Sequence, residues 1–423
     1  MTRLLIPSAV MPHPAHSVRA ANVVIEQLLR ALADTPDVQP VFLPVFPGAS
    51  ASFDPDTTKA LRDLAEAGVE MADPLILPAA VEKPLSRTGR LFDRTLERFQ
   101  PLAAFSEQAS AAVRRCKADW VMTIWSEPLT ALFAKTDAKK FAYYGNPDPK
   151  NFRAGFGLQK KSGAGLRSSL RHWVHGRHLE AAHLEMMRSW DIIGDVAALD
   201  AKYYLRSGHP HSVYIQNVWI DRFGWPEVKR RHDEAEAGKR NGAPVEIVAS
   251  IGKVAGTANT YGLLYLVNEL LPELRRVFAS KPFELHIFGS GAAHPLVAPL
   301  LKQKEIVLRG FVDDLDDEMI RKPIFLCVNN ATEYNVGHTR YLHAFTMGSC
   351  VVASSNTSLA MPEIEHGVNA LLGKNAAEIA EYVRLAADDV GLRRRLGEAG
   401  YDTYDRVFRA TTVARRIAGE INA

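Results

Sequence analysis

The chain has 423 residues, of which 47% are hydrophobic and 23% are charged. This composition excludes a disordered chain and an integral membrane protein, and the length favours two domains because one hydrophobic core rarely organises more than about 250–300 residues. The formal charge is only +3, which is too small to predict a nucleic-acid-binding protein.

The amino terminus and the cysteines bear on cellular location. Residues 1–14 contain a short apolar run that Pro7 interrupts, and no run of about 18 apolar residues follows anywhere. We therefore expect no signal peptide, no membrane span and a cytoplasmic location. Cys116, Cys327 and Cys350 are far apart and lack C-x-x-C spacing, which argues against disulfides and zinc binding.

The first half of the chain has the pattern of an α/β domain, predicted to span residues 1–224. Residues 17–34 have the character of a helix, with Ser17 as its expected N-cap. Short runs with strand character occupy residues 3–10, 38–45, 118–125, 139–145, 190–196 and 211–218. The charged residues 225–244, which include Gly238, Gly242 and Pro244, lack a sustained apolar period and are predicted to form a linker.

The second half shows the same alternation more clearly. Strands are predicted at residues 245–251, 283–288, 305–310, 324–328 and 350–354. Between the first two, apolar residues recur with the spacing of one helical face at Leu263, Leu266, Val267, Leu270, Leu274 and Val277. Apolar strands separated by amphipathic helices predict a doubly wound parallel sheet, here over residues 245–403. The helical residues 404–423 follow the last strand, and we expect them to cross back to the first domain.

Ligands of open parallel sheets bind at the carboxyl ends of the strands, where loops meet the amino termini of helices. Glycine there lets the backbone approach a ligand, and helix amino termini offer unpaired amides to an anion. For any single glycine, a tight turn is the more ordinary explanation. Four glycine-containing loops at strand ends favour a diphosphate site: residues 250–256, 288–294, 309–314 and 329–340.

Two cations lie in these loops. Lys253 follows Gly252 at the end of a strand, where it would neutralise a departing diphosphate; the alternative is a solvated surface lysine. Arg340 lies in the first turn of the helix after Gly337 and would clamp the same phosphate; the alternative is a salt bridge to Asp313 or Asp314.

Polar residues near Arg340 are candidates for sugar contacts. Glu333 would accept hydrogen bonds from sugar hydroxyls, or is an exposed loop carboxylate. His343 lies three residues beyond Arg340, on the same helical face. It would contact a ribose, or is a satisfied core histidine.

Several segments of the second half resemble a known family. They are "ELHIFGSG" (284–291), "IVLRGFVDDL" (306–315), "RYLHAFTMGSCVVASSN" (340–356), "EIEHGVNALL" (363–372) and "LRRRLGEAGYDTYDRVF" (392–408). In order and spacing they resemble the carboxy-terminal half of the family 4 (group 1) glycosyltransferases, over residues 245–410. In the first half, "VYIQNVWIDRF" (213–223) resembles that family's turn into the second domain, with Asn217 and Asp221 in matching places.

The resemblance implies a GT-B architecture, in which two Rossmann-like doubly wound parallel-sheet domains face a central cleft. It also implies a retaining transferase that moves a sugar from a nucleotide-diphosphate donor to a glycan, lipid-linked or other hydroxyl acceptor, without a metal or other cofactor.

The chain departs from the family pattern at two points. Asn335 and His343 replace the two glutamates of the family signature. Lys253 matches the first of the family's two phosphate-binding cations, but Tyr261 lies near the place of the second, and Arg340 would supply the missing charge.

Together these observations predict the residues of a donor site in the second domain. The diphosphate is expected to contact Gly252, Lys253, Gly337, His338, Thr339 and Arg340. The sugar or nucleoside is expected to contact Gly289, Gly291, Phe311, Val312, Glu333, Asn335 and His343.

The first domain is expected to present the acceptor. Ser17 and Arg19 are predicted on the acceptor side, and His13, His16 and Asp148 are the candidate catalytic groups. Surface-loop histidines and a simple Asn-Pro-Asp-Pro turn are the alternatives. A base is not obligatory, because the departing phosphate can itself take the acceptor's proton.

Residues 158–180 contain Lys160, Lys161, Arg167, Arg171 and Arg177, interleaved with apolar residues and with no acid before Glu180. This pattern is typical of a helix that rests on an anionic membrane, and equally of a solvated helix covering the sheet. Membrane contact would place the protein at the inner face of the cytoplasmic membrane. Two other functions stay open: a binding or scaffold protein of this fold, and a sugar-nucleotide epimerase of the same architecture.

Overall fold

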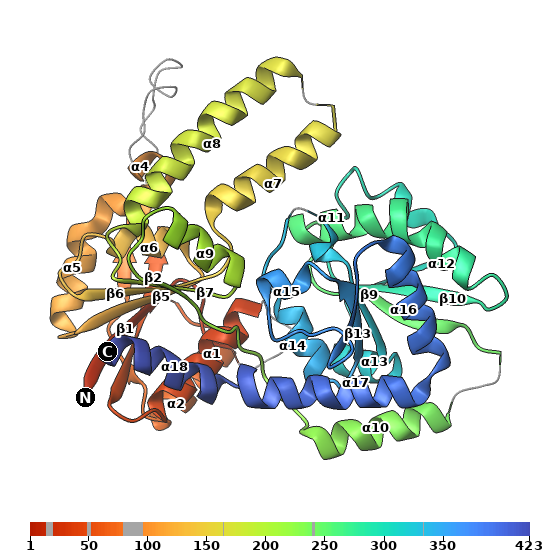
Figure 1. Cartoon of the computed structure of the whole chain (residues 1–423). Helices are drawn as coiled ribbons and strands as arrows, with labels where there is room; N and C mark the ends of the chain where they lie inside the picture. Colours follow the sequence, from red (N-terminus) through yellow and green to blue (C-terminus); the bar gives the residue numbers. More distant parts are fainter. Residues whose placement is uncertain (14–19, 49–51, 79–95, 164, 239–241, 333) are drawn as a thin grey trace. The chain divides into compact units, whose positions relative to one another are not determined.

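The computed structural model describes residues 1–13, 20–48, 52–78, 96–163, 165–238, 242–332 and 334–423. The chain forms two compact units. Unit 1 comprises Met1–Val218 and Ala410–Ala423, and unit 2 comprises Trp219–Arg409. Each unit contains a parallel sheet with helices packed against it (Figure 1).

The sheet of unit 1 has the strand order β3-β2-β1-β5-β6-β7-β8, and β4 also pairs with β2. All of these pairs are parallel. The central strand β1 is buried on both faces, as Leu4, Leu5 and Ile6 have no exposed surface. The strands are β1 (Thr2–Ser8), β2 (Val38–Pro47), β3 (Glu70–Met71), β4 (Leu75–Leu77), β5 (Trp120–Ile124), β6 (Lys139–Tyr144), β7 (Ile192–Asp195) and β8 (Ser212–Tyr214).

The helices of unit 1 include the carboxy-terminal helix, which packs on α1. The hydroxyl of Thr2 donates to Asn422 at 2.9 Å, so the two ends of the chain are held together. The helices are α1 (Ala20–Ala33), α2 (Pro55–Glu66), α4 (Leu96–Phe99), η1 (Pro101–Phe105), α5 (Ser106–Arg115), α6 (Glu127–Phe133), α7 (Asp148–Lys161), α8 (Leu166–Met187), α9 (Ala198–Arg206) and α18 (Ala410–Asn422).

The sheet of unit 2 has the strand order β11-β10-β9-β12-β13-β14, with parallel pairs throughout. This is the 3-2-1-4-5-6 order of a Rossmann fold. The strands are β9 (Val245–Ser250), β10 (Phe283–Phe288), β11 (Ile306–Gly310), β12 (Ile324–Cys327), β13 (Cys350–Ser354) and β14 (Ala370–Gly373).

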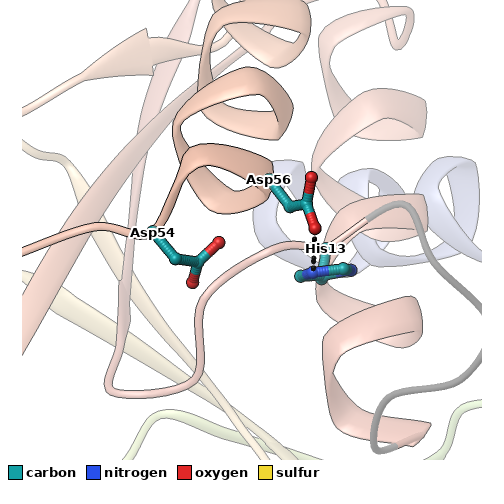
Figure 2. Close-up of side chains that lie close together, drawn as sticks. All are labelled: His13, Asp54 and Asp56. Carbon is teal, nitrogen blue, oxygen red and sulfur yellow. Dashed lines mark ion pairs between the residues drawn. The ribbon is translucent and has the colours of Figure 1, made fainter.

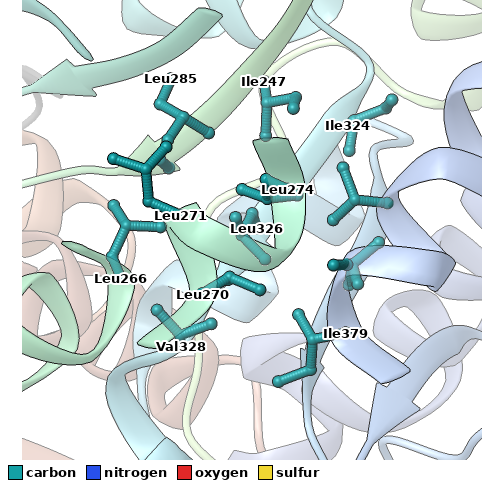
Figure 3. Close-up of a cluster of buried hydrophobic side chains, with 14 of the residues drawn as sticks. Ile247, Leu266, Leu270, Leu271, Leu274, Leu285, Ile324, Leu326, Val328 and Ile379 are labelled. Atoms are coloured by element: carbon teal, nitrogen blue, oxygen red, sulfur yellow. The ribbon is translucent and has the colours of Figure 1, made fainter. Parts of the chain in front are cut away.

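Helices cover both faces of this sheet, and leucine and isoleucine side chains from both element types form the core between them (Figure 3). The helices are α10 (Trp225–Ala237), α11 (Thr257–Tyr265), η2 (Leu266–Leu270), α12 (Leu271–Val277), η3 (Leu300–Lys302), α13 (Leu315–Arg321), η4 (Asn329–Ala331), α14 (Thr339–Thr346), α15 (Thr357–Ala360), α16 (Ala376–Asp388), α17 (Val390–Thr403) and η5 (Tyr404–Phe408).

The helix predicted from the apolar stripe at Leu263–Val277 is present, but it is interrupted by the π-helical turn η2. Pro272 explains the change, because a proline inside a helix lacks an amide and collides with the carbonyl four residues earlier. The stripe itself is buried as predicted, with Leu266, Leu270 and Leu274 fully enclosed.

For residues 225–244 the structure differs from the prediction of a linker. Their first part is helix α10, which belongs to unit 2. It has a narrow apolar face of Trp225 and Val228 that packs on Gly348, where an added Cβ would lie 2.9 Å from the Trp225 ring. Two apolar residues among many charges gave too weak a periodic signal for the helix to be predicted.

Every predicted strand is present within a few residues of its expected ends. The short strands β3, β4 and β14 were not predicted, because runs of two to four residues carry little periodicity. The three cysteines are buried and unpaired. Within the described part of the chain, no helix is both long enough and apolar enough to cross a bilayer.

Candidate functional site

In unit 2, the strand order changes direction at β9, which has β10 on one side and β12 on the other. At such a point the loops leaving neighbouring strands diverge, which opens a crevice at their carboxyl ends. The loops after β9, β10 and β12 contain most of the predicted donor residues.

The loops after β9 and β10 touch through their backbones. Gly289 has φ 149°, and a Cβ added there would lie 1.7 Å from the carbonyl oxygen of Gly252, so only glycine fits. The amide of Val254 donates to Ser290 at 3.2 Å, and the amide of Gly289 donates to Gly310 at 2.8 Å. These contacts tie three successive loops together and leave the Lys253 side chain exposed above them.

A buried asparagine connects Lys253 with Arg340. The Asn259 side-chain amide donates to the Lys253 carbonyl at 2.8 Å, and its oxygen accepts from the Arg340 guanidinium. The same oxygen accepts from Asn329 at 2.9 Å. The predicted alternative for Arg340, a salt bridge to Asp313 or Asp314, is not what the structure has. Asn259 was not predicted from the sequence, because an isolated polar residue near a helix start has no distinctive signal.

The first turn of α14 lies after β12 and begins at Thr339, with His338 as N-cap. First-turn amides lack a partner four residues earlier in the helix. The Tyr341 amide instead donates to the His338 carbonyl at 3.3 Å, so the preceding amides of Thr339 and Arg340 are the ones offered to an anion. Asn330 fixes the preceding loop by hydrogen bonds in both directions with Val336, at 3.1 and 3.2 Å. The side-chain oxygen of Asn335 is buried without a hydrogen-bond partner among the described residues.

His343 has a defined protein partner. Its Nε2 lies 2.6 Å from Oδ1 of Asp316, and its ring packs on Trp219 with centroids 5.3 Å apart. Arg222 donates to the other oxygen of Asp316. Burial would raise the pKa of Asp316, but the hydrogen bond and charge of His343, together with the Arg222 guanidinium, outweigh it and lower that pKa to about 2. His343 thus has the contacts of a satisfied buried histidine, and its side chain is 10% exposed.

The remaining donor candidates are less constrained. Phe311 is 60% exposed, so its ring is available to a ligand. Gly291 is exposed and has φ 87°, while Val312 and Gly337 are half-buried. Glu333 lies outside the described residues.

In unit 1, His13 follows β1 and lies next to two carboxylates at the start of α2 (Figure 2). Its Nε2 is 3.8 Å from Asp56, and donor atoms of His13, Asp54 and Asp56 all lie within 4.8 Å of one another. This spacing suits a cation, but Asp54 is also the N-cap of α2, where its two oxygens accept from the amide and hydroxyl of Thr57 at 2.8 Å. Helix capping accounts for Asp54, and Asp56 is an acidic residue of the first turn of α2. The catalytic role of His13 stays a prediction. The predicted residues His16, Ser17 and Arg19 lie outside the described residues.

Asp148 begins α7, directly after β6, and accepts from Gln100 at 2.9 Å. Burial and the nearby charge of Glu127 raise its pKa to about 6, against the opposing effects of His183 and Gln100. Glu127 and His183 belong to a buried polar network. Nδ1 of His183 pairs with Glu127, and Nε2 of His183 lies 2.9 Å from the hydroxyl of Tyr204. One oxygen of Glu127 is buried without a hydrogen-bond partner among the described residues. The sequence did not indicate Glu127 or His183, which are 56 residues apart.

Solved structures of known proteins are similar to the whole chain, whereas two comparisons of the sequence found no match. No protein-family model and no curated protein matches the sequence. Sucrose-phosphate synthase from Thermosynechococcus elongatus is similar in structure, with a TM-score of 0.59 and 14% identity over 100% of this chain and 98% of that chain. Anabaena HepE in complex with UDP and glucose has a TM-score of 0.58 and 12% identity over 100% of both chains. The lipopolysaccharide outer core galactosyltransferase WaaB has a TM-score of 0.58 and 10% identity over 100% of this chain and 99% of that chain.

These neighbours have the GT-B fold, and the chain shares it: two Rossmann-like domains with parallel sheets. The predicted α/β fold class is therefore confirmed. The assignment to family 4 in particular stays a prediction.

Proposed function

We propose that the protein is a glycosyltransferase that binds a nucleotide-diphosphate sugar on unit 2 and transfers the sugar to a hydroxyl acceptor. The observation that supports this most is that Asn259 bonds both the main-chain carbonyl of Lys253 and the Arg340 guanidinium, which holds these two residues near each other at the carboxyl ends of β9 and β12. A surface suited to a diphosphate would combine the two cations with the first-turn amides of α14. The close backbone contact between Gly252 and Gly289 would let the ligand approach the main chain. HepE, a structural neighbour, was crystallised with UDP and glucose, and WaaB is described as a galactosyltransferase.

The proposed reaction breaks the bond between the anomeric carbon and the diphosphate, and its electron pair leaves with the phosphate. The acceptor oxygen forms the new bond to that carbon and loses its proton. Lys253 and Arg340 stabilise the negative charge that develops on the leaving diphosphate. We propose that transfer proceeds with retention, as the resemblance implies. We also propose that it needs no metal, because these two cations supply the charge compensation.

The acceptor is proposed to be a glycan or a lipid-linked compound with a free hydroxyl, bound through unit 1. Asp148 is the candidate proton acceptor in that unit, because its carboxyl has a raised pKa and is half-buried. A lipid-linked acceptor would bring the protein to the inner face of the cytoplasmic membrane.

One specific observation favours a second candidate, a binding protein of this fold with weak or no catalysis. Asn335 and His343 occupy the places of the two glutamates in the family signature, and His343 is already held by Asp316. An epimerase of the same architecture has less support. It needs an acid and a base paired around the nucleotide, and the sequence did not indicate such a pair.

Thermal unfolding with a panel of nucleoside diphosphates, together with an assay of donor hydrolysis, separates the transferase from the binding protein. A ligand that binds only the folded state raises the melting temperature according to its concentration and affinity. We expect one diphosphate to stabilise the protein, with its monophosphate as the matched control giving a smaller effect. We also expect slow hydrolysis of the corresponding nucleotide sugar. Stabilisation without any hydrolysis would support the binding protein, and no stabilisation by any diphosphate would contradict both proposals.

A further inference from the structure

Helices α7 and α8 of unit 1 form a hairpin that extends beyond the sheet (Figure 1). Its outer surface carries three large apolar side chains on the first turns of α8. Leu166 is 88% exposed, Leu170 is 64% exposed and Trp173 is 58% exposed. Such exposure is unusual for three neighbouring large apolar residues and indicates a surface that binds something.

The three residues form one stripe, because positions i, i+4 and i+7 lie on the same face of a helix. The hairpin does not need this face for its own packing. Its two helices meet on the opposite side of α8, where His172 and His175 pack on Phe152 with centroids 5.9 and 4.9 Å apart. The packing of α7 on α8 therefore leaves the outer stripe exposed.

Cations lie along the stripe and on one side of it. The side chains of Arg167, Arg171 and Arg177 are exposed on α8, and Lys160 is exposed at the end of α7. No Asp or Glu occurs between Asp148 and Glu180. Among the described residues, Arg167 and Arg171 have no ion-pair partner, while the Arg177 guanidinium lies over the Trp173 ring at 5.3 Å. The charge of this surface is therefore available to an anionic partner.

We propose that the stripe Leu166, Leu170 and Trp173 docks on a bilayer that contains anionic phospholipids. The apolar side chains would insert at the boundary between headgroups and acyl chains, with tryptophan at the level it favours. The arginines beside them would meet lipid phosphates. A second copy of this chain is a poorer partner, because it would bring the same positive charges against each other. This inference does not depend on which sugar is transferred, or on whether transfer occurs.

The test is flotation of the full-length protein with vesicles of phosphatidylcholine alone or mixed with phosphatidylglycerol. We expect binding only to the mixed vesicles, weakened by salt. Leu170→Ser with Trp173→Ala should abolish it, whereas Leu205→Ser, at a 47% exposed leucine on α9, should not. Arg167→Gln with Arg171→Gln should weaken binding by roughly 30-fold, taking the usual contribution of each arginine near an anionic surface. Arg395→Gln with Arg406→Gln, both exposed in unit 2, is the matched charge control.

Circular dichroism and the melting temperature show whether each variant is folded, so that lost binding is not lost structure. Equal binding to both vesicle types, or binding that both pairs of variants leave unchanged, would overturn the proposal. So would light scattering that shows a dimer broken by Leu170→Ser together with no vesicle binding. An acidic protein captured through this stripe in the absence of lipid affinity would overturn it too. The outcome is separable from the proposed function, because nucleoside diphosphate binding on unit 2 is measured without vesicles.

Discussion

Nε2 of His343 lies 2.6 Å from Oδ1 of Asp316, and this pair joins helix α14 to helix α13. A carboxylate at this distance fixes Nε2 as the protonated nitrogen. This buried, charge-assisted hydrogen bond therefore holds α14, whose first turn contains Arg340, in place against α13.

Asp316→Asn is expected to destabilise unit 2 by about 2 kcal/mol near neutral pH. The pKa of Asp316 is lowered from 3.8 to about 2 in the folded protein. A lowered pKa means that the folded state favours the carboxylate, so its stabilisation is complete above about pH 4 and is lost as the pH falls towards 2. Urea unfolding at several pH values should show the difference between the two proteins shrinking over that window. Asp317→Asn, at a neighbouring carboxylate paired with Arg321 near the surface, is the control and should behave like the natural protein.

Lys253→Ala and Arg340→Ala should each weaken nucleoside diphosphate binding by about 1–3 kcal/mol, the usual loss for a charge-assisted hydrogen bond. The fold should survive Arg340→Ala, because the Asn259 oxygen keeps its hydrogen bond from Asn329. Titration calorimetry measures the affinities, with Lys302→Ala and Arg395→Ala at exposed cations of the same unit as controls. Unchanged affinity in both site variants would show that the diphosphate binds elsewhere.

The strands and the fold class were predictable because buried parallel strands and amphipathic helices have strong periodic patterns. The positions of Lys253 and Arg340 after strands and next to glycines could be read from the sequence, and their role in diphosphate binding stays a prediction. Their connection could not be read from it, because Asn259 and Asn329 are 70 residues apart and only the folded backbone brings them together. The same limit applies to Asp316, whose role depends on His343 and Arg222 from distant segments. The periodicity of apolar residues identifies a segment as a strand or a helix. A buried polar network depends on which segments lie next to each other in the fold, and periodicity does not show that.

The backbone contact between Gly289 and Gly252 predicts a large effect from a small substitution. Gly289→Ala places a Cβ 1.7 Å from a carbonyl oxygen at a φ of 149°, so the loops after β9 and β10 must separate. We expect a loss of at least about 3 kcal/mol in the free energy of unfolding. Gly291→Ala is the matched control: its φ is 87°, but nothing lies within 4 Å of the added Cβ, so only backbone strain of about 1–2 kcal/mol is expected. Chemical denaturation of the two variants measures both values, and equal losses would show that the close approach has no energetic weight.

Asp148 makes the proton-transfer step testable by pH. Burial and the charge of Glu127 raise its pKa to about 6. A raised carboxyl pKa means that the folded state favours the protonated form, and this preference is lost as the pH rises through 6. If Asp148 accepts the acceptor's proton as a carboxylate, kcat/KM must fall below about pH 6.

Asp148→Asn should remove that acidic limb of the pH profile and most of the rate. Glu127→Gln keeps an oxygen for His183 but removes the charge, so it should move the limb to lower pH, whereas Glu107→Gln on the exposed face of α5 should leave it in place. A profile that neither Asp148→Asn nor Glu127→Gln changes would assign the proton to another group, and the departing phosphate would be the next candidate.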